Sequence, residues 1–175
     1  MTEPSEIRAR FQEAASAFLA LRPAILAGEP WSLAVAFDHS PEAHWGPPEI
    51  LAHVAEMVRY WLGEVERIAS SASAPASFGR IATDPVRIAI VGRDRTVPLR
   101  DLWDRIDSDC ARWERRLAEL SAAELARAGI HPLAGSMTAG DVAERFVVAH
   151  LEDHAAQLRT ALSGPSSSPA AASRP

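Results

Sequence analysis

Apolar residues recur at intervals of three and four in four long segments of the chain, which is the spacing of one face of an α-helix. These segments cover residues 5–27, 47–69, 98–119 and 139–162. Gly28 marks the expected end of the first helix, and Pro47 and Pro48 suit the first turn of the second. Four helices of similar length predict an all-α fold, a four-helix bundle.

Polar residues with helix-capping preferences precede several of the expected helices. Thr96 is a candidate N-cap for the third. Thr138 with Asp141 three residues later has the form of a capping box for the fourth. Ser121 and Glu124 form the same pattern between the third and fourth helices, which predicts a further short helix there.

The connections between these helices are long. They cover residues 28–46, 70–97 and 120–138, whereas helix connections in bundles are usually about two to eight residues. We therefore expect crossover loops that pass an end of the bundle or cover a site. In the second connection, residues 70–75 are expected to be flexible, and residues 86–91 fit either a short strand or an extra helical turn.

The length and composition are those of one domain with a tail. The chain has 175 residues, of which 47% are hydrophobic, and residues 163–175 are Ser, Pro, Ala and Gly with a single Arg. This composition predicts a four-helix domain over residues 1–162 and a disordered tail over 163–175. The single cysteine excludes an internal disulfide and a zinc site built from several cysteines.

The charge balance excludes some classes of partner. The net charge is −5, and all 18 basic residues are arginine. A net negative chain lacks the clustered cations that bind phosphate backbones, so we expect no nucleic-acid partner. No apolar run approaches the roughly 18 residues of a membrane span, and the first ten residues lack the apolar stretch of a signal peptide. We therefore expect a soluble, cytoplasmic protein with no membrane contact.

Three histidines lie on the apolar faces of two predicted helices. His150 and His154 are one turn apart in a row of residues spaced by four, and His53 lies between Ile50 and Met57 on the second helix. A buried imidazole needs a hydrogen-bond partner or a metal ion, and one divalent ion would serve all three. Three nitrogen ligands leave a coordination position open, which is the pattern of a catalytic metal. The alternative is a structural bundle whose histidines are satisfied by hydrogen bonds.

Three passages resemble the DinB-like (damage-inducible) superfamily of metal-binding four-helix proteins. The stretch from Trp45 to His53 is similar to the start of that family's second helix, where a Trp and a Pro precede a metal-binding His. The stretch from His131 to Thr138 is similar to the family's approach to its last helix, and the passage that begins at His150 has the H-x-x-x-H-x-x-Q-L pattern. The resemblance covers about residues 5–162.

The resemblance implies a metal site of His53, His150 and His154, with zinc or nickel as the ion, and often a homodimer. Characterised relatives include S-transferases that use mycothiol or bacillithiol and a mycothiol-dependent maleylpyruvate isomerase. We therefore expect a metal-dependent enzyme, a thiol-dependent S-transferase that acts on electrophilic small molecules with a low-molecular-weight thiol as co-substrate. The alternatives are a metal-dependent hydrolase or isomerase, and a non-catalytic bundle that binds a metal or small ligand. The residues do not name a catalytic group.

Three further residues are candidates for a pocket beside the metal. These are His131, Tyr60 and Gln157. His131 precedes Pro132 in an expected loop, where it could cap the last helix, touch substrate or lie on the surface. Tyr60 flanks the inward face of the second helix and fits either a pocket lining or a surface position.

The other residues considered have simpler interpretations. Cys110 lies on the apolar stripe of the third helix, where we expect a buried structural thiol and not a nucleophile. The helical tryptophans Trp61, Trp103 and Trp113 are expected in the core. The loop histidines His39 and His44 are expected to be inert. The cluster of Arg93, Arg95 and Arg100 could hold an anion or be solvated.

Overall fold

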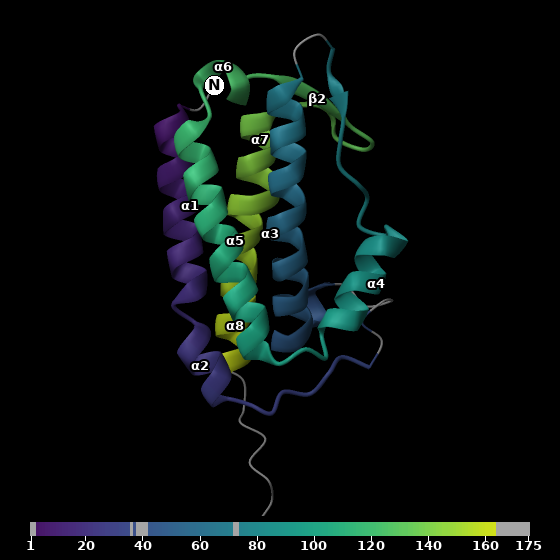
Figure 1. Cartoon of the computed structure of the whole chain (residues 1–175). Coiled ribbons are helices and arrows are strands. Elements are labelled where there is room, and N and C mark those ends of the chain that lie inside the picture. Colours follow the sequence, from purple (N-terminus) through teal and green to yellow (C-terminus); the bar gives the residue numbers. More distant parts are fainter. Residues whose placement is uncertain (1–2, 36, 38–41, 72–73, 164–175) are drawn as a thin grey trace, which may run out of the picture.

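The fold is a bundle of four long helical segments with a small sheet at one end (Figure 1). The computed structural model describes residues 3–35, 37, 42–71 and 74–163. The bundle helices are α1 (Pro4–Leu19), α3 (Pro47–Ser70), α5 (Leu99–Glu119) and the segment of α7 (Ala139–Ala143) and α8 (Ala149–Ser163). This arrangement confirms the predicted all-α four-helix bundle.

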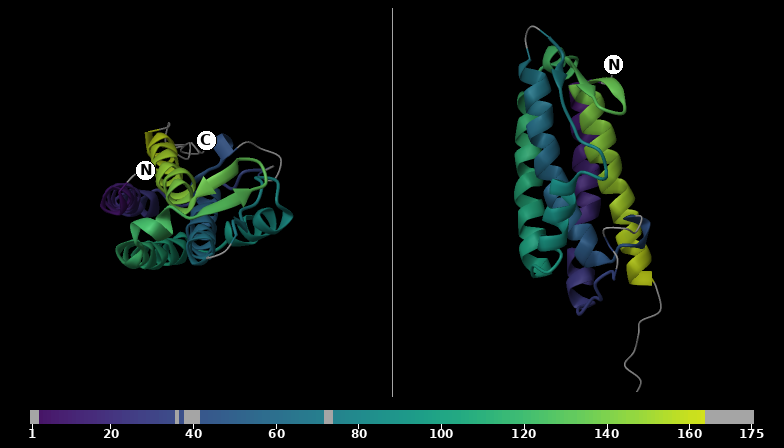
Figure 2. Two further views of the ribbon diagram at one scale, coloured as in Figure 1. Left: turned by 90° about the horizontal axis from the view of Figure 1, so that it is seen from above. Right: turned by 90° about the vertical axis from the view of Figure 1, so that its right-hand side faces the viewer.

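The order of the helices requires one connection that runs the length of the bundle. Figure 1 shows α3 and α5 running in the same direction, and α1 and the α7–α8 segment running in the opposite one. The connection between α3 and α5 therefore returns from one end of the bundle to the other, alongside α3 (Figure 2). It carries the short strand β1 (Ala76–Ser77) and the helix α4 (Pro85–Asp94).

The first predicted helix is in fact two helices, so the prediction of one helix over residues 5–27 is wrong. After α1, the chain turns at Ala20 and Leu21 and continues as α2 (Arg22–Ala27). Pro23 explains the break, because proline has no N–H to donate and its ring collides with the carbonyl four residues earlier, that of Leu19. Pro23 instead occupies the first turn of α2, where both properties are tolerated.

Residues 86–91 are helical, so the strand interpretation of this segment is wrong. The Asp84 side chain accepts hydrogen bonds from the backbone N–H groups of Val86 and Arg87 and so caps α4. The predicted N-cap role of Thr96 is also wrong. Pro98 occupies that position of α5, and the Thr96 hydroxyl donates to the carbonyl of Arg93.

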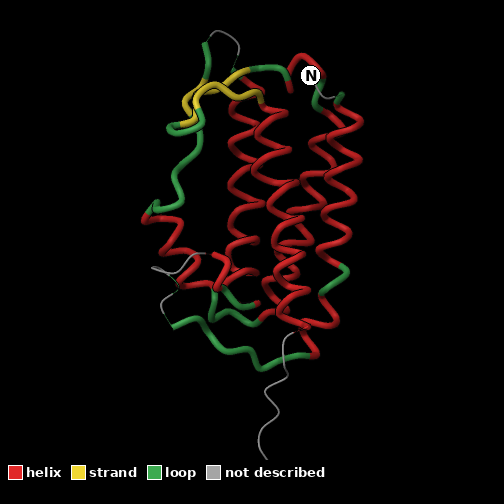
Figure 3. The backbone as a smooth tube through the Cα atoms, turned by 180° about the vertical axis from the view of Figure 1, so that it is seen from behind, coloured by secondary structure: helices red, strands yellow, loops and turns green. Residues whose placement is uncertain are grey.

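The connection between α5 and α7 contains a hairpin that helical periodicity did not predict. The predicted short helix α6 (Ala122–Leu125) is present with its capping box. It is followed by β2 (Ala128–His131) and β3 (Gly135–Thr138), which pair antiparallel, while β1 joins β2 in parallel (Figure 3). Four-residue strands are too short to show a clear period of two. His131 is therefore the buried end of a strand and not a loop residue.

The last bundle segment contains one turn of π-helix, η2 (Glu144–Val148), directly before α8. The predicted capping box of Thr138 and Asp141 opens the segment as expected. The wider π turn rotates the side chains that follow it relative to an uninterrupted α-helix. His154 is buried, whereas Phe146 and His150 are only half-buried and line a cavity.

The core contains the aromatic side chains that the sequence placed there. Trp61, Trp103 and Trp113 are buried, and the Trp113 indole donates to the carbonyl of Val58. Cys110 is buried on α5, and burial raises the pKa of its thiol to about 12. The thiol therefore stays protonated, which fits a structural residue better than a nucleophile. None of the described helices combines the length and the apolar character that crossing a membrane requires.

Some sequence predictions concern residues that lie outside the described part of the chain. Residues 164–175 of the predicted tail, residues 72–73 of the predicted flexible segment and His39 are among them. Ser163, the first residue of the predicted tail, is the last residue of α8.

Candidate metal centre

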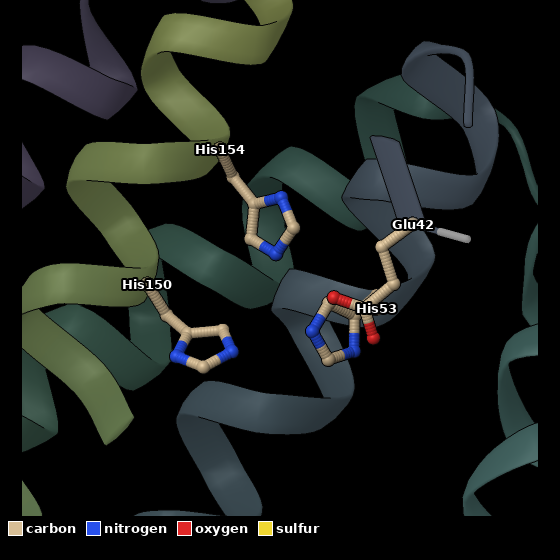
Figure 4. Close-up of side chains that lie close together, drawn as sticks. All are labelled: Glu42, His53, His150 and His154. Carbon is tan, nitrogen blue, oxygen red and sulfur yellow. The ribbon is translucent and has the colours of Figure 1, made fainter. Parts of the chain in front are cut away.

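Four side chains that can ligate a metal meet between α3, α8 and the short 3₁₀ turn η1 (Glu42–His44). They are Glu42, His53, His150 and His154, and each offers one ligand atom within 4.8 Å of the others. Figure 4 shows the three imidazoles and the carboxylate pointing toward one another. The structure therefore brings together the three histidines that the sequence selected and adds a carboxylate.

Helix geometry positions the three rings. His150 and His154 lie one turn apart on α8, with ring centroids separated by 5.8 Å. His53 faces them from α3, with its ring centroid 6.1 Å from that of His150 and 5.1 Å from that of His154. Two rigid helices thus present the imidazoles to one small volume, without dependence on loop conformation.

Gln157 orients His154. Its amide nitrogen donates to the backbone carbonyls of Glu42 and Trp45, so its amide oxygen is the atom that lies 3.1 Å from His154 Nδ1. Nδ1 therefore carries the proton and donates it, which leaves Nε2 unprotonated. The same glutamine ties the segment that carries Glu42 to α8. A partner of this kind is typical of histidines that ligate metals.

Two imidazole nitrogens of the cluster are buried without a partner. Nε2 of His53 and Nε2 of His154 have no hydrogen-bond partner among the described residues; outside the cluster, the same holds for Nε1 of Trp103 and Nε2 of His131. Burial lowers the pKa of both imidazoles, and the nearby His154 and Arg87 charges lower that of His53 further. Both rings are therefore neutral at physiological pH. Nε2 of His154 is unprotonated, which is the form that binds a metal. Nδ1 of His53 accepts from the Arg87 guanidinium, so the His53 proton lies on Nε2, and a metal bound at that atom would have to displace it.

Glu42 is the member of the cluster that sequence reasoning missed. It lies in η1, outside every helix that periodicity identified, and only its position shortly before Trp45 pointed to the site. An ion pair with Arg87 holds its carboxylate. Arg87 also donates to the carbonyl of Ala82, and its guanidinium lies 3.3 Å from Nδ1 of His53.

A cavity of about 130 Å³ lies beside this cluster. Its polar lining includes His53 and His150, and its apolar lining includes Trp61 and Phe146, whose rings stack with centroids 4.3 Å apart. The full lining comprises Glu42, His53, Met57, Trp61, Arg80, Ile81, Ala82, Arg87, Phe146 and His150. A small molecule in the cavity would lie directly against the ligand set.

Comparison with known proteins agrees with this geometry. The DinB superfamily model matches residues 2–158 of the chain, which includes all four side chains of the cluster. The chain belongs to the DinB superfamily. No curated protein and no solved structure matches it significantly.

The resemblance implies a metal ion, and the residues of this DinB-superfamily chain fit one. Three imidazoles and a carboxylate are nitrogen and oxygen donors of the kind that zinc and other divalent transition metals accept. The buried Nε2 atoms of His53 and His154 cost free energy unless a ligand satisfies them, and the unprotonated Nε2 of His154 is suited to a metal. The cluster could therefore hold a divalent ion.

The structure places two of the three predicted pocket residues away from the cavity. His131 Nδ1 accepts from the backbone N–H groups of Leu133 and Ala134. Its ring stacks on that of Phe146, with 5.3 Å between the ring centroids, and it does not line the cavity. Tyr60 lies under the guanidinium of Arg80, 3.8 Å from its ring centroid, and lines a separate cavity of about 450 Å³ between α3, α4 and α5. The third, Gln157, contacts Nδ1 of His154.

The arginine cluster near α5 is engaged in structural contacts. Arg93 pairs with Asp94, and Arg95 pairs with Glu49 and donates to the carbonyl of Ala34. Arg100 is exposed, as is the loop histidine His44. The three arginines therefore do not converge on one anion site.

Proposed function

We propose that this chain is a metal-dependent enzyme, a thiol-dependent S-transferase that acts on electrophilic small molecules. His53, His150 and His154 would hold the ion, and zinc or nickel suits their nitrogen donors. The observation that carries the proposal is the convergence of two partnerless imidazole nitrogens and a carboxylate beside a small cavity. A site with no opening would instead favour a purely structural ion.

The residues of the site have distinct parts in such a reaction. A divalent ion bound there would lower the pKa of a thiol and so supply thiolate at neutral pH. Glu42 is the carboxylate within the cluster that can take up the thiol proton. The stacked rings of Trp61 and Phe146 form a wall that keeps water from one side of the reacting groups. Gln157 keeps the His154 ring in one orientation and one tautomer.

The thiol would come from a co-substrate. The chain has one cysteine, and Cys110 is buried on α5 with its thiol pKa raised to about 12. It lines neither the small cavity nor the larger one. A nucleophilic sulfur in this site therefore has to belong to a low-molecular-weight thiol.

A second candidate function is metal-dependent hydrolysis or isomerisation, and the position of Glu42 favours it. A carboxylate beside an activated water can act as a general base. A Glu42→Gln variant separates two possible roles of this carboxylate, general base and metal ligand. Loss of hydrolysis with retained metal indicates a base, whereas loss of the metal indicates a ligand.

Metal analysis is the first test. We expect the purified protein to carry close to one equivalent of a divalent ion and His53→Ala or His150→Ala to lose it. His44→Ala, which alters an exposed histidine of η1, is the matched control and should retain it. Absence of metal, with an unchanged melting temperature on addition of a chelator, would leave only the structural bundle.

Thiol consumption is the second test. The metal-loaded protein is assayed with mycothiol, bacillithiol, glutathione or cysteine together with a bromobimane as the electrophile. We expect metal-dependent consumption of at least one thiol, absent from the chelated protein and from His150→Ala. Stoichiometric metal without turnover in any combination would favour the non-catalytic binding bundle.

A further inference from the structure

Two arginines, the half-buried Arg80 and the buried Arg87, line the small cavity beside the candidate metal cluster. We infer that this cavity binds a small organic anion, a carboxylate with a flat apolar body, and that Arg80 is its specificity-determining contact. The inference rests on the proposed metal site, because the ion contributes to the charge of the cavity. It extends that proposal by naming the chemical class of the substrate.

Arg80 is held rigidly but retains free donors. Its side chain is 12% exposed, it pairs with Glu56, whose side chain is 6% exposed, and its guanidinium carbon lies 3.8 Å from the centroid of the Tyr60 ring. Both hydrogen bonds to Glu56 come from Nη2, and no described residue accepts one from Nε or Nη1. Since a guanidinium has five N–H donors, Arg80 can still bind a carboxylate.

Arg87 provides a second cation in the same lining. Its side chain is 9% exposed and is tied to η1 through Glu42 and to the preceding loop through the carbonyl of Ala82. Arg80 and Arg87 come from the connection that runs alongside α3, whereas the histidines come from the bundle. The lining of the cavity thus combines two cations with candidate metal ligands.

The charge of the cavity changes when an ion is present. Arg80 and Arg87 are balanced by Glu56 and Glu42, so the metal-free cavity is close to neutral. A divalent ion therefore adds two positive charges without a counter-charge. Uncompensated buried charge is costly, so an anion is the favoured ligand of the loaded cavity.

The size and the apolar wall of the cavity select an organic anion over phosphate or sulfate. A volume of about 130 Å³ is close to the roughly 150 Å³ of a cavity that accepts benzene. Trp61 and Phe146 present stacked rings to it, and Met57 and Ile81 complete the apolar lining. A flat apolar group against these rings would place its carboxylate at the arginines or the ion.

Calorimetric titration of the zinc-loaded protein with benzoate tests the inference, with benzamide as the neutral analogue of the same shape. We expect benzoate to bind at least about tenfold more tightly than benzamide. Arg80→Gln should weaken benzoate binding by about 10-fold to 100-fold, the range for hydrogen bonds to charged groups, and leave benzamide binding and zinc content unchanged.

Two further variants keep the result interpretable. Because Arg80→Gln leaves Glu56 buried without its partner, the double variant Arg80→Gln/Glu56→Gln removes both charges and should show the same loss of benzoate affinity. Arg59→Gln changes an exposed arginine of α3 that lines the larger neighbouring cavity, and it should bind benzoate normally.

The possible outcomes separate this inference from the proposed function. Equal binding of benzoate and benzamide, or unchanged benzoate affinity in both Arg80 variants, overturns the anion site while stoichiometric zinc leaves the metal site intact. A loss confined to Arg59→Gln places the anion in the other cavity and also overturns the inference. Failure of the wild-type protein to take up zinc overturns the metal site and the anion site together.

Discussion

Two buried polar residues on successive turns of α3 have opposite hydrogen-bonding environments. Glu49 is fully buried, and its carboxylate accepts from the N–H groups of Ala34 and Gly46 and from the Arg95 guanidinium. His53, four residues later, is 3% exposed, and its Nε2 has no partner among the described residues. Burial by itself therefore does not distinguish the two.

The distinction lies in which polar atoms are satisfied. The Glu49 carboxylate ties Ala34, Gly46 and Arg95 to the start of α3, so its burial is compensated within the protein. His53 and His154 each keep one nitrogen without a partner, both belong to the cluster with Glu42, and His53 also lines the cavity. Nε1 of Trp103 and Nε2 of His131 are also buried without a partner, but only His53 and His154 belong to a cluster of possible metal ligands.

Removal of the Glu49 carboxylate should have the largest effect on stability. Glu49→Ala removes the acceptor of two backbone N–H groups and the ion-pair partner of Arg95, and breaking a buried pair typically costs about 3–5 kcal/mol. Urea denaturation measures this loss. Glu66→Ala, which alters an exposed glutamate of the same helix, should change the unfolding free energy by less than about 0.5 kcal/mol. Equal costs for the two variants would contradict the structural role of Glu49.

His53→Leu should behave in the opposite way, because it removes an unsatisfied polar group. With a chelator present, we expect its unfolding free energy to lie within about 1 kcal/mol of wild type. With metal at about 1,000 times the dissociation constant, wild type should gain about 4 kcal/mol and the variant almost nothing. Chemical denaturation with and without metal gives both values. A loss of several kcal/mol in chelator would show that His53 is structural.

Gln157→Leu should weaken metal binding without abolishing it. The variant loses the acceptor that orients His154 and the donor that ties the backbone of Glu42 to α8. Loss of such a supporting partner typically costs about 10-fold to 100-fold in metal affinity. Competition with a chelator of known affinity measures the change, and Gln12→Leu on α1 is the control. Unchanged affinity would mean that helix geometry alone orients His154.

The smallest expected effect is on the pH dependence of stability, through the ionisation of Tyr60. Burial and the Glu64 carboxylate raise the pKa of its phenol to about 12, from about 10. Since the folded state holds this proton more tightly than the unfolded state, stability from Tyr60 is present below pH 10 and is lost as the pH rises toward 12. Tyr60 is the only tyrosine, so ultraviolet absorbance follows it directly, and Tyr60→Phe removes the signal. A midpoint near 10 would place the phenol in bulk water.

Helical periodicity and capping residues, both properties of the sequence by itself, determined much of the fold and part of the site. The spacing of apolar residues placed three of the four bundle segments, and two capping boxes marked the start of α6 and α7. The same spacing placed His53, His150 and His154 on the inward faces of their helices. These features are local, because a helix repeats every 3.6 residues and its caps lie within one turn of its end.

Tertiary structure alone decided the rest of the site. Glu42, Arg80 and Arg87 belong to connections with no periodic signal, and they reach the histidines only because the chain folds those connections against α3. His131 joined a strand because β2 pairs with β3, and the π turn set which residues of the last segment face the cavity. Such positions depend on contacts between residues far apart in sequence, which the pattern along a single segment does not contain.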